Sequence, residues 1–173
     1  MNELVDEPAD AHGVTVRRVR EDDLPDVVAM VYELAEYERL LDECHLTVDA
    51  LRTGLFGPAP VLFGHIAVRE GVGTVGMALW FLNYSTWTGV PGIYLEDLYV
   101  RPEHRGGGAG RALLAELAAE CVREDYQRLQ WAVLDWNTPS IEFYRRLGAE
   151  LTPEWVGCRM TGAALADLAS ESN

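Results

Sequence analysis

Residues 92–124 read GIYLEDLYV, RPEHRGGGAG and RALLAELAAECVRE in direct succession. The first part is apolar, with β-branched and aromatic side chains, which favours a strand. The last part has the pattern of an amphipathic helix, with Leu113, Leu114, Leu117 and Val122 among its apolar residues. These residues therefore predict a strand that leads through a glycine cluster into an amphipathic helix.

The glycine cluster reads RGGGAG from Arg105 to Gly110 and lies where the helix is expected to begin. Helix N-termini carry amides without helical partners and the positive end of the dipole, so they bind phosphate oxygens. Glycines let a ligand approach the backbone, although a tight turn without a ligand explains them equally well. Arg111-Ala112 after Gly110 excludes a Walker loop, and Arg111 replaces the third glycine of a GxGxxG dinucleotide site.

The rest of the chain alternates strand and helix patterns around this unit. Before the glycine cluster we expect a strand, two helices and three strands, over residues 14–19, 22–38, 47–55, 61–68, 74–84 and 92–100. Thr47 is expected to cap the second of these helices. After it we expect a helix, a strand, a helix, a strand and a terminal helix, over residues 108–124, 128–134, 139–147, 154–160 and the Ala-rich C-terminus. Only the middle strands can pair through tight turns, so the pattern predicts an α/β (α+β) fold with a mixed sheet covered by helices.

Length and composition indicate one domain without disulfides. The chain has 173 residues, 49% of them hydrophobic, which is enough for a single core over residues 14–173 behind a flexible tail, residues 1–13. The three cysteines are far apart and odd in number, as expected of thiols in a reducing compartment. The acidic start lacks the features of a secretory signal and no run reaches membrane-spanning length, so we expect a cytoplasmic protein without a membrane partner.

The net charge of the chain indicates which kinds of ligand it can attract. The formal net charge is −14, which disfavours nucleic acid, because binding to a polyanion depends on phosphate neutralisation. A negative field attracts cations, although it also serves solubility alone. The four histidines are scattered without ligand spacing, so we expect no metal site.

Two segments resemble the GNAT superfamily of acetyltransferases. Arg105, Gly108 and Gly110 match its coenzyme A loop, Arg/Gln-x-x-Gly-x-Gly/Ala, and residues 136–149, WNTPSIEFYRRLGA, resemble its second coenzyme-binding segment. The resemblance implies the GNAT fold, a mostly antiparallel mixed sheet flanked by helices, and acetyl-CoA as the acetyl donor.

A closer resemblance is to the diamine (spermidine/spermine-type) and thialysine acetyltransferases. It is carried by ELAEYE at residues 33–38, YLEDLYV at residues 94–100 and the segment from Trp136, and it covers most of residues 14–160. Ser85 stands where diamine-acetylating relatives carry an acidic residue, and the interval from Trp87 to Glu96 is longer by one residue. The acceptor therefore stays open among a diamine, lysine or a lysine analogue, and another amino compound.

The same resemblance implies where the coenzyme binds. We expect the backbone of residues 98–100 to pair with the pantetheine amides and the glycine cluster to meet the pyrophosphate. The expected coenzyme-binding residues are Leu98, Tyr99, Val100, Arg105, Gly106, Gly107, Gly108, Ala109, Gly110, Arg111, Asn137, Ser140, Phe143, Tyr144 and Arg145.

The chemistry needs a base, and the resemblance implies Glu96. An alkylamine with a pKa of about 10.4 is almost wholly protonated at pH 7, and exposing its lone pair costs about 4.6 kcal/mol. Glu96 is expected to remove that proton, directly or through a water. The alternative is that Glu96 and Asp97 simply hydrogen-bond at a strand edge. Tyr144 corresponds to the tyrosine that assists the departing sulfur, although Ile141, Tyr144 and Leu147 also share a helical face typical of a core.

Further residues are candidates for holding the acceptor. Acidic groups help most when they hold a second, distant amine, because a carboxylate beside the reacting amine stabilises the cation that must lose its proton. The candidates are Tyr37, Glu38, Trp87, Glu96 and Asp97, with Glu36 as a further possibility. Glu36 and Glu38 also fit a solvated helix face, and Tyr37 and Trp87 also fit the margin of a core.

We therefore expect an N-acetyltransferase that acts on a small cationic amine by direct attack, and a homodimer by resemblance, with the segment from Glu154 onward at its interface. Two alternatives stay open. One is an acyl-CoA sensor without catalysis, and the other is a protein or peptide N-acetyltransferase.

Overall fold

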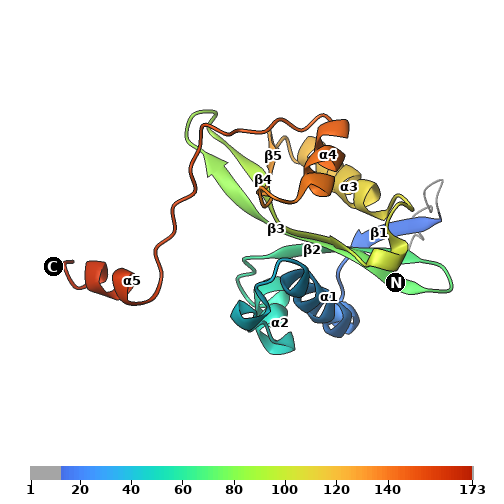
Figure 1. The fold of residues 1–173 in the computed structure, drawn as a ribbon, viewed down its shortest axis with the longest axis horizontal. Coiled ribbons are helices and arrows are strands. Elements are labelled where there is room, and N and C mark those ends of the chain that lie inside the picture. Colours follow the sequence, from blue (N-terminus) through green and yellow to red (C-terminus); the bar gives the residue numbers. More distant parts are fainter. Residues whose placement is uncertain (1–12, 173) are drawn as a thin grey trace. The chain divides into compact units, whose positions relative to one another are not determined.

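The computed structural model describes residues 13–172, and the chain forms two compact units, one up to Ala132 and one from Val133 (Figure 1). Apart from Gly13, the expected tail lies outside the described residues. Of the helices in the described chain, none has the length and apolar character needed to span a bilayer.

The first unit is built on a five-stranded mixed sheet with strand order β1-β2-β3-β4-β5. Its strands are β1 (Val14–Arg18), β2 (Phe63–Arg69), β3 (Gly73–Ser85), β4 (Val90–Val100) and β5 (Leu129–Gln130). The first four pair antiparallel, and β5 pairs parallel to β4. The predicted mostly antiparallel mixed sheet is confirmed.

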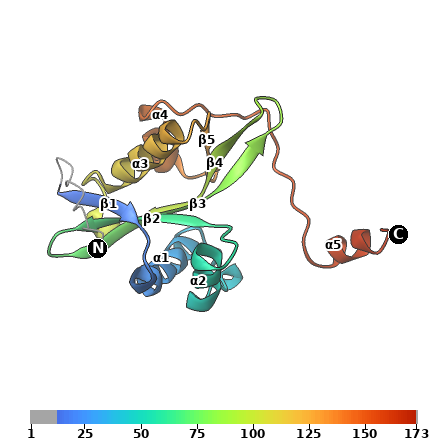
Figure 2. The ribbon, with the colours of Figure 1, turned by 180° about the vertical axis from the view of Figure 1, so that it is seen from behind.

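Helices cover both faces of this sheet. Helices α1 (Leu24–Tyr37) and α2 (Val48–Phe56) lie on one side and α3 (Ala109–Arg123) on the other, as the reverse view in Figure 2 shows. The Thr47 hydroxyl caps α2 by accepting the Ala50 amide at 3.1 Å, as the sequence predicts. The core between α1, α2 and the sheet is formed by Val19, Leu24, Val27, Met30, Leu51, Leu55, Ile66, Met77, Leu79 and Tyr99.

A β-bulge interrupts the pairing of β3 with β4. Leu79 pairs with Asp97, but the next residue, Trp80, pairs with Leu95. Glu96 is therefore the extra residue of β4 and has no partner in β3. Since consecutive residues of β3 point to opposite faces, Asp97 lies on the α1 face with Leu79, and Leu95 lies on the α3 face with Trp80.

The C-terminal unit contains two helices, α4 (Thr138–Arg146) and α5 (Gly162–Ala169). The strand expected over residues 128–134 is shortened to the two residues of β5, which corrects the prediction. The strand expected over residues 154–160 is wrong, since these residues form no ladder. Strand propensity needs a neighbouring edge, and this segment pairs with none in the described part of the chain.

Candidate active site

The glycine cluster forms the N-terminus of α3. Gly106 and its N-cap Gly108 adopt left-handed backbone conformations, with φ of 76° and 85°. The Ala112 amide is bonded to the Gly108 carbonyl at 2.9 Å, so the amides of the turn before it have no helical acceptor. Together with the helix dipole, these amides form a cradle that fits a pyrophosphate.

Arg69, at the end of β2, lies against this cradle and was missed from the sequence. Its Nη2 donates to the Gly107 carbonyl at 3.4 Å, and a Cβ on Gly107 would lie 2.4 Å from that nitrogen. The Arg69 Nε is buried without a hydrogen-bond partner in the described chain. A single arginine at a strand end carries no signal in the sequence, because most such residues are solvated.

Arg105 turns away from the cradle. Its guanidinium lies 5.4 Å from the centroid of the Tyr37 ring and 5.6 Å from that of Tyr99, and its Nε donates to the Val100 carbonyl at 2.9 Å. It borders a pocket of about 460 Å³ lined by Glu33, Glu36, Tyr37, Tyr99, Arg101, Pro102, Glu103 and Arg105. The side chain of Arg105 therefore faces a pocket beside α1 that holds both signs of charge.

Glu38, Glu96 and Asp97 form what we call the acidic cluster. Three causes together raise the pKa of Asp97 to about 6. Burial is the largest, and the negative charges of Glu96 and Glu38 follow. Burial also raises the pKa of Glu38, which caps the C-terminus of α1. Glu96 is exposed at the bulge. Burial and the two neighbouring carboxylates all disfavour the charged form of Asp97, so a bound cation would lower the electrostatic cost of this cluster.

The acidic cluster and the pocket share one face of β4. Asp97 and Tyr99 are two residues apart on the α1 face, a separation of roughly 7 Å along a strand. Tyr37, which lines the pocket, and Glu38, which belongs to the cluster, are neighbours at the end of α1, so the pocket and the cluster adjoin at this corner. The structure thus brings together four of the five expected acceptor residues.

Trp87 is the fifth and lies elsewhere. It is 89% exposed in the turn after the last pair of the β3–β4 hairpin, Ser85 with Val90. Glu96 follows Val90 by roughly 20 Å along the strand. The structure does not bring Trp87 to the acidic cluster.

The edge of β4 expected to hold pantetheine is open. β5 pairs with β4 at Ile93 and Tyr94, whereas β4 continues to Val100. In the described residues no strand pairs with this edge over residues 98–100, so its backbone groups can accept a strand-like ligand. The Tyr99 ring is buried in the core and leaves only its backbone for such a ligand.

The C-terminal unit holds the remaining expected residues on and before α4. The Asn137 side chain caps this helix by accepting the Ser140 amide at 3.4 Å. Tyr144 is buried and its ring lies 5.3 Å from that of Phe143, while Arg145 is exposed.

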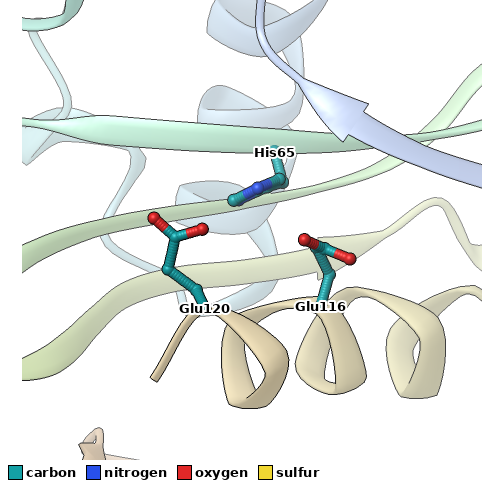
Figure 3. A group of neighbouring side chains, drawn as sticks. All are labelled: His65, Glu116 and Glu120. Atoms are coloured by element: carbon teal, nitrogen blue, oxygen red, sulfur yellow. The ribbon is translucent and has the colours of Figure 1, made fainter. Parts of the chain in front are cut away.

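A second set of charged residues lies on the α3 face of the sheet and was also missed from the sequence. His65 of β2 faces Glu116 and Glu120 of α3, with one ligand atom of each within 4.8 Å of the others (Figure 3). We call these three residues the imidazole–glutamate cluster. Their separation in the sequence gives no ligand spacing, so only the fold shows that they meet.

The donor set of this cluster fits an ion-pair network better than a metal site. The Trp80 Nε1–H donates to His65 Nδ1 at 3.1 Å, and a neutral ring that accepts at Nδ1 carries its proton on Nε2, where no lone pair is left for a metal. Burial lowers the pKa of His65 to about 4. Arg18 pairs with Glu120, and Arg123 pairs with both glutamates, at 3.1 Å to Glu116.

Comparisons with known proteins agree with this architecture. The profile of the acetyltransferase (GNAT) family matches residues 19–149. The chain is 38% identical over 170 residues to a thialysine N-epsilon-acetyltransferase of Sus scrofa, covering 91% of this chain and 98% of that protein. It is 40% identical over 90 residues to an L-ornithine N5-acetyltransferase of Arabidopsis thaliana, covering 52% of this chain and 40% of that protein.

Among solved structures, the chain is similar to an integron cassette protein from the mobile metagenome of V. cholerae. The TM-score is 0.75 at 26% identity, and the match covers 91% of this chain and 98% of that one. With the fold, the glycine cradle and the family profile in agreement, the chain belongs to the acetyltransferase (GNAT) family.

Proposed function

We propose that the protein is an acetyl-CoA-dependent N-acetyltransferase whose acceptor is a small cationic amine of the lysine or ornithine type. The observation that carries this proposal is the acidic cluster, which lies at the β4 bulge and adjoins the pocket beside α1. The relatives named for thialysine and ornithine support an amino acid acceptor. Ser85 in place of an acidic residue favours it over a polyamine.

Acetyl-CoA supplies an activated acetyl group: the amine nitrogen bonds to the acetyl carbon, the carbon–sulfur bond breaks and coenzyme A leaves. Glu96, exposed at the bulge, accepts the proton that the ammonium must lose, through a water where the distance requires one. By its resemblance to the family, Tyr144 assists the departing sulfur. A phenol with a pKa of about 10 protonates a thiolate near 8.5 only uphill, so Tyr144 acts mainly by stabilising developing charge.

Asp97 and Glu38 have a different role in this proposal. They hold the positive charge of the acceptor at a distance from the reacting nitrogen, since a carboxylate in contact with that nitrogen would keep it protonated. Tyr37, which is 39% exposed, offers an aromatic wall for the methylene chain. The arginines and glutamates of the pocket suit a zwitterionic amino acid better than a polycation.

The residues present fit the coenzyme. The cradle from Gly106 to Arg111, with Arg69 behind it, suits the pyrophosphate, and the open edge of β4 at residues 98–100 suits pantetheine. Asn137, Ser140, Phe143 and Arg145 are proposed as further coenzyme-binding residues, on the resemblance of residues 136–149 to the family segment. The family profile runs from residue 19 to 149, which supports one functional domain over residues 14–173.

We also propose a homodimer in which the C-terminal segment lies at the interface. Trp155 and Val156 are 72% and 85% exposed, and Leu165 and Leu168 of α5 are more than half exposed. Exposed apolar surface of this extent is typical of a segment that packs against a partner. A monomer mass that stays constant with concentration would contradict this proposal.

The test is coenzyme A release from acetyl-CoA by the purified protein with lysine, thialysine, ornithine, spermidine, putrescine and a basic peptide. We expect the highest kcat/KM for thialysine, lysine or ornithine. A clear preference for spermidine would contradict the amino acid acceptor, and a preference for the peptide would favour a protein N-acetyltransferase. Tight acetyl-CoA binding without turnover of any acceptor would favour the sensor alternative.

A further inference from the structure

Trp80 occupies a particular place in the sheet. It is the β3 residue on one side of the register shift, paired with Leu95, while its neighbour Leu79 is paired with Asp97. Trp80 is 2% exposed, so its indole is buried on the α3 face beside Leu95, the residue that precedes Glu96 at the bulge. A bulge re-aims a side chain, and its direction depends on the residues packed against it.

Three groups hold the indole of Trp80. Phe63 stacks on it with ring centroids 4.6 Å apart, and the Arg18 guanidinium lies 5.0 Å from its centroid. Both contacts allow a ring to slide or turn in its plane. The hydrogen bond from Nε1 to His65 Nδ1 at 3.1 Å is directional and fixes the ring orientation.

The surroundings of His65 keep this bond in place. The charged groups that face it are Arg18 from β1 and Glu116, Glu120 and Arg123 from α3, two of each sign. An indole N–H can only donate, so Nδ1 must stay unprotonated for the bond to exist. Burial, and after it the charge of Arg18, lower the pKa of His65 to about 4, so the ring accepts this bond throughout the usual assay range.

We propose that His65 is a positioning residue for acetyl transfer: by accepting the Trp80 N–H it fixes the side chain beside the bulge and thereby the place of Glu96. This inference rests on the proposed role of Glu96 as the base. His65 itself touches neither substrate, because it lies on the α3 face of the sheet and Asp97 lies on the other.

The test compares His65→Leu, which removes the acceptor, with His65→Asn, whose Oδ1 takes the place of Nδ1. The matched control is Ile66→Val, a change at the next residue of β2. Ile66 is also fully buried, but it packs into the core between α1, α2 and the sheet. All are assayed as the full chain with acetyl-CoA and thialysine, and with lysine or ornithine where turnover of those is higher.

For His65→Leu we expect kcat to fall about 10-fold at pH 7 with the KM for acetyl-CoA unchanged, because a misplaced base contributes less. The deficit should shrink by pH 9.5, since the free fraction of an amine with a pKa near 10.4 rises more than 100-fold and the base matters less. His65→Asn should recover most of the activity, and Ile66→Val should behave as the wild type.

A deficit that is the same at every pH, or one shared by Ile66→Val, would assign His65 a purely structural role and overturn the inference. If His65→Leu does not fold, Trp80→Phe, which removes the N–H and keeps an aromatic ring, is read by the same criteria. Glu96→Gln distinguishes a failure of this inference from a failure of the proposed role of Glu96 as the base. If it loses activity and the His65 variants do not, only this inference fails, whereas a fully active Glu96→Gln ends the proposed base and the inference with it.

Discussion

Two groups of charged residues, the imidazole–glutamate cluster and the acidic cluster, lie on opposite faces of one sheet, and they differ in how their charge is balanced. The imidazole–glutamate cluster has two arginines for its two glutamates, and its imidazole is neutral. In the acidic cluster, burial and the charges of Glu96 and Glu38 all raise the pKa of Asp97. The two faces meet at consecutive residues of β3, Ala78 opposite His65 and Leu79 opposite Asp97.

The difference separates charge that supports the fold from charge that serves a ligand. Ion pairs closed within the chain repay part of their desolvation on folding. Carboxylates crowded together without a cation cost free energy of folding, and such cost is typical of a binding or catalytic site. Replacing a carboxylate by its amide therefore has different consequences on the two faces.

The largest expected effect is that of Glu96→Gln on catalysis. Loss of a general base lowers kcat by roughly 10²- to 10³-fold, while acetyl-CoA binding, measured by calorimetry, stays unchanged. Glu124→Gln, at an exposed carboxylate beyond the end of α3, is the control and should keep full activity. Equal activity of the two variants would remove Glu96 from the mechanism.

Next in size is the loss of stability in Glu120→Gln. Glu120 is 8% exposed and pairs with Arg18 and Arg123, so the amide removes the charge partner of Arg18 and leaves Arg123 with Glu116 alone. We expect the free energy of unfolding to fall by about 2–3 kcal/mol, a Tm lower by roughly 4–10 °C. An unchanged Tm in thermal unfolding would show that this network does not support the fold.

The smallest expected effect is a gain of stability, in Asp97→Asn. Because the folded-state pKa of Asp97 is about 6 and lies above its ordinary value, the wild type loses stability as pH rises from about 4 to about 6. Asp97→Asn should lack this loss and be more stable at pH 8 by about 1–2 kcal/mol, while the KM for the acceptor rises several-fold. Denaturant unfolding from pH 4 to pH 8 checks the stability, and a destabilised variant would contradict the comparison.

The sequence predicted what is local and missed what depends on distant partners. The Thr47 cap, the span of α1 and the glycine cradle follow from side chains within a few residues of one another. The contact of Arg69 with Gly107 joins residues from separate elements, and no periodicity marks it. Residues 154–160 have strand composition but lack a neighbouring edge in the described chain, so propensity alone was misleading.

The same limit applies within the candidate site. Glu96 and Asp97 were singled out from a motif, but the motif does not show that one occupies a bulge and the other a buried position. Trp87 was named with them as a candidate aromatic contact for the acceptor, whereas the hairpin carries it to its exposed tip. Distance along an antiparallel hairpin is a poor guide to proximity, since the strand length between two residues separates them.

The bulge also shifts the phase of β4. In a regular strand, residues two apart share a face, but Leu95 and Asp97 lie on opposite faces because Glu96 is inserted between them. The strand therefore reads in one alternation up to Leu95 and in the opposite one from Asp97 onward. Deleting Glu96 would therefore join the two alternations into one regular strand: Leu95 and Asp97 would become consecutive residues on opposite faces, and every other side chain of β4 would keep its present layer.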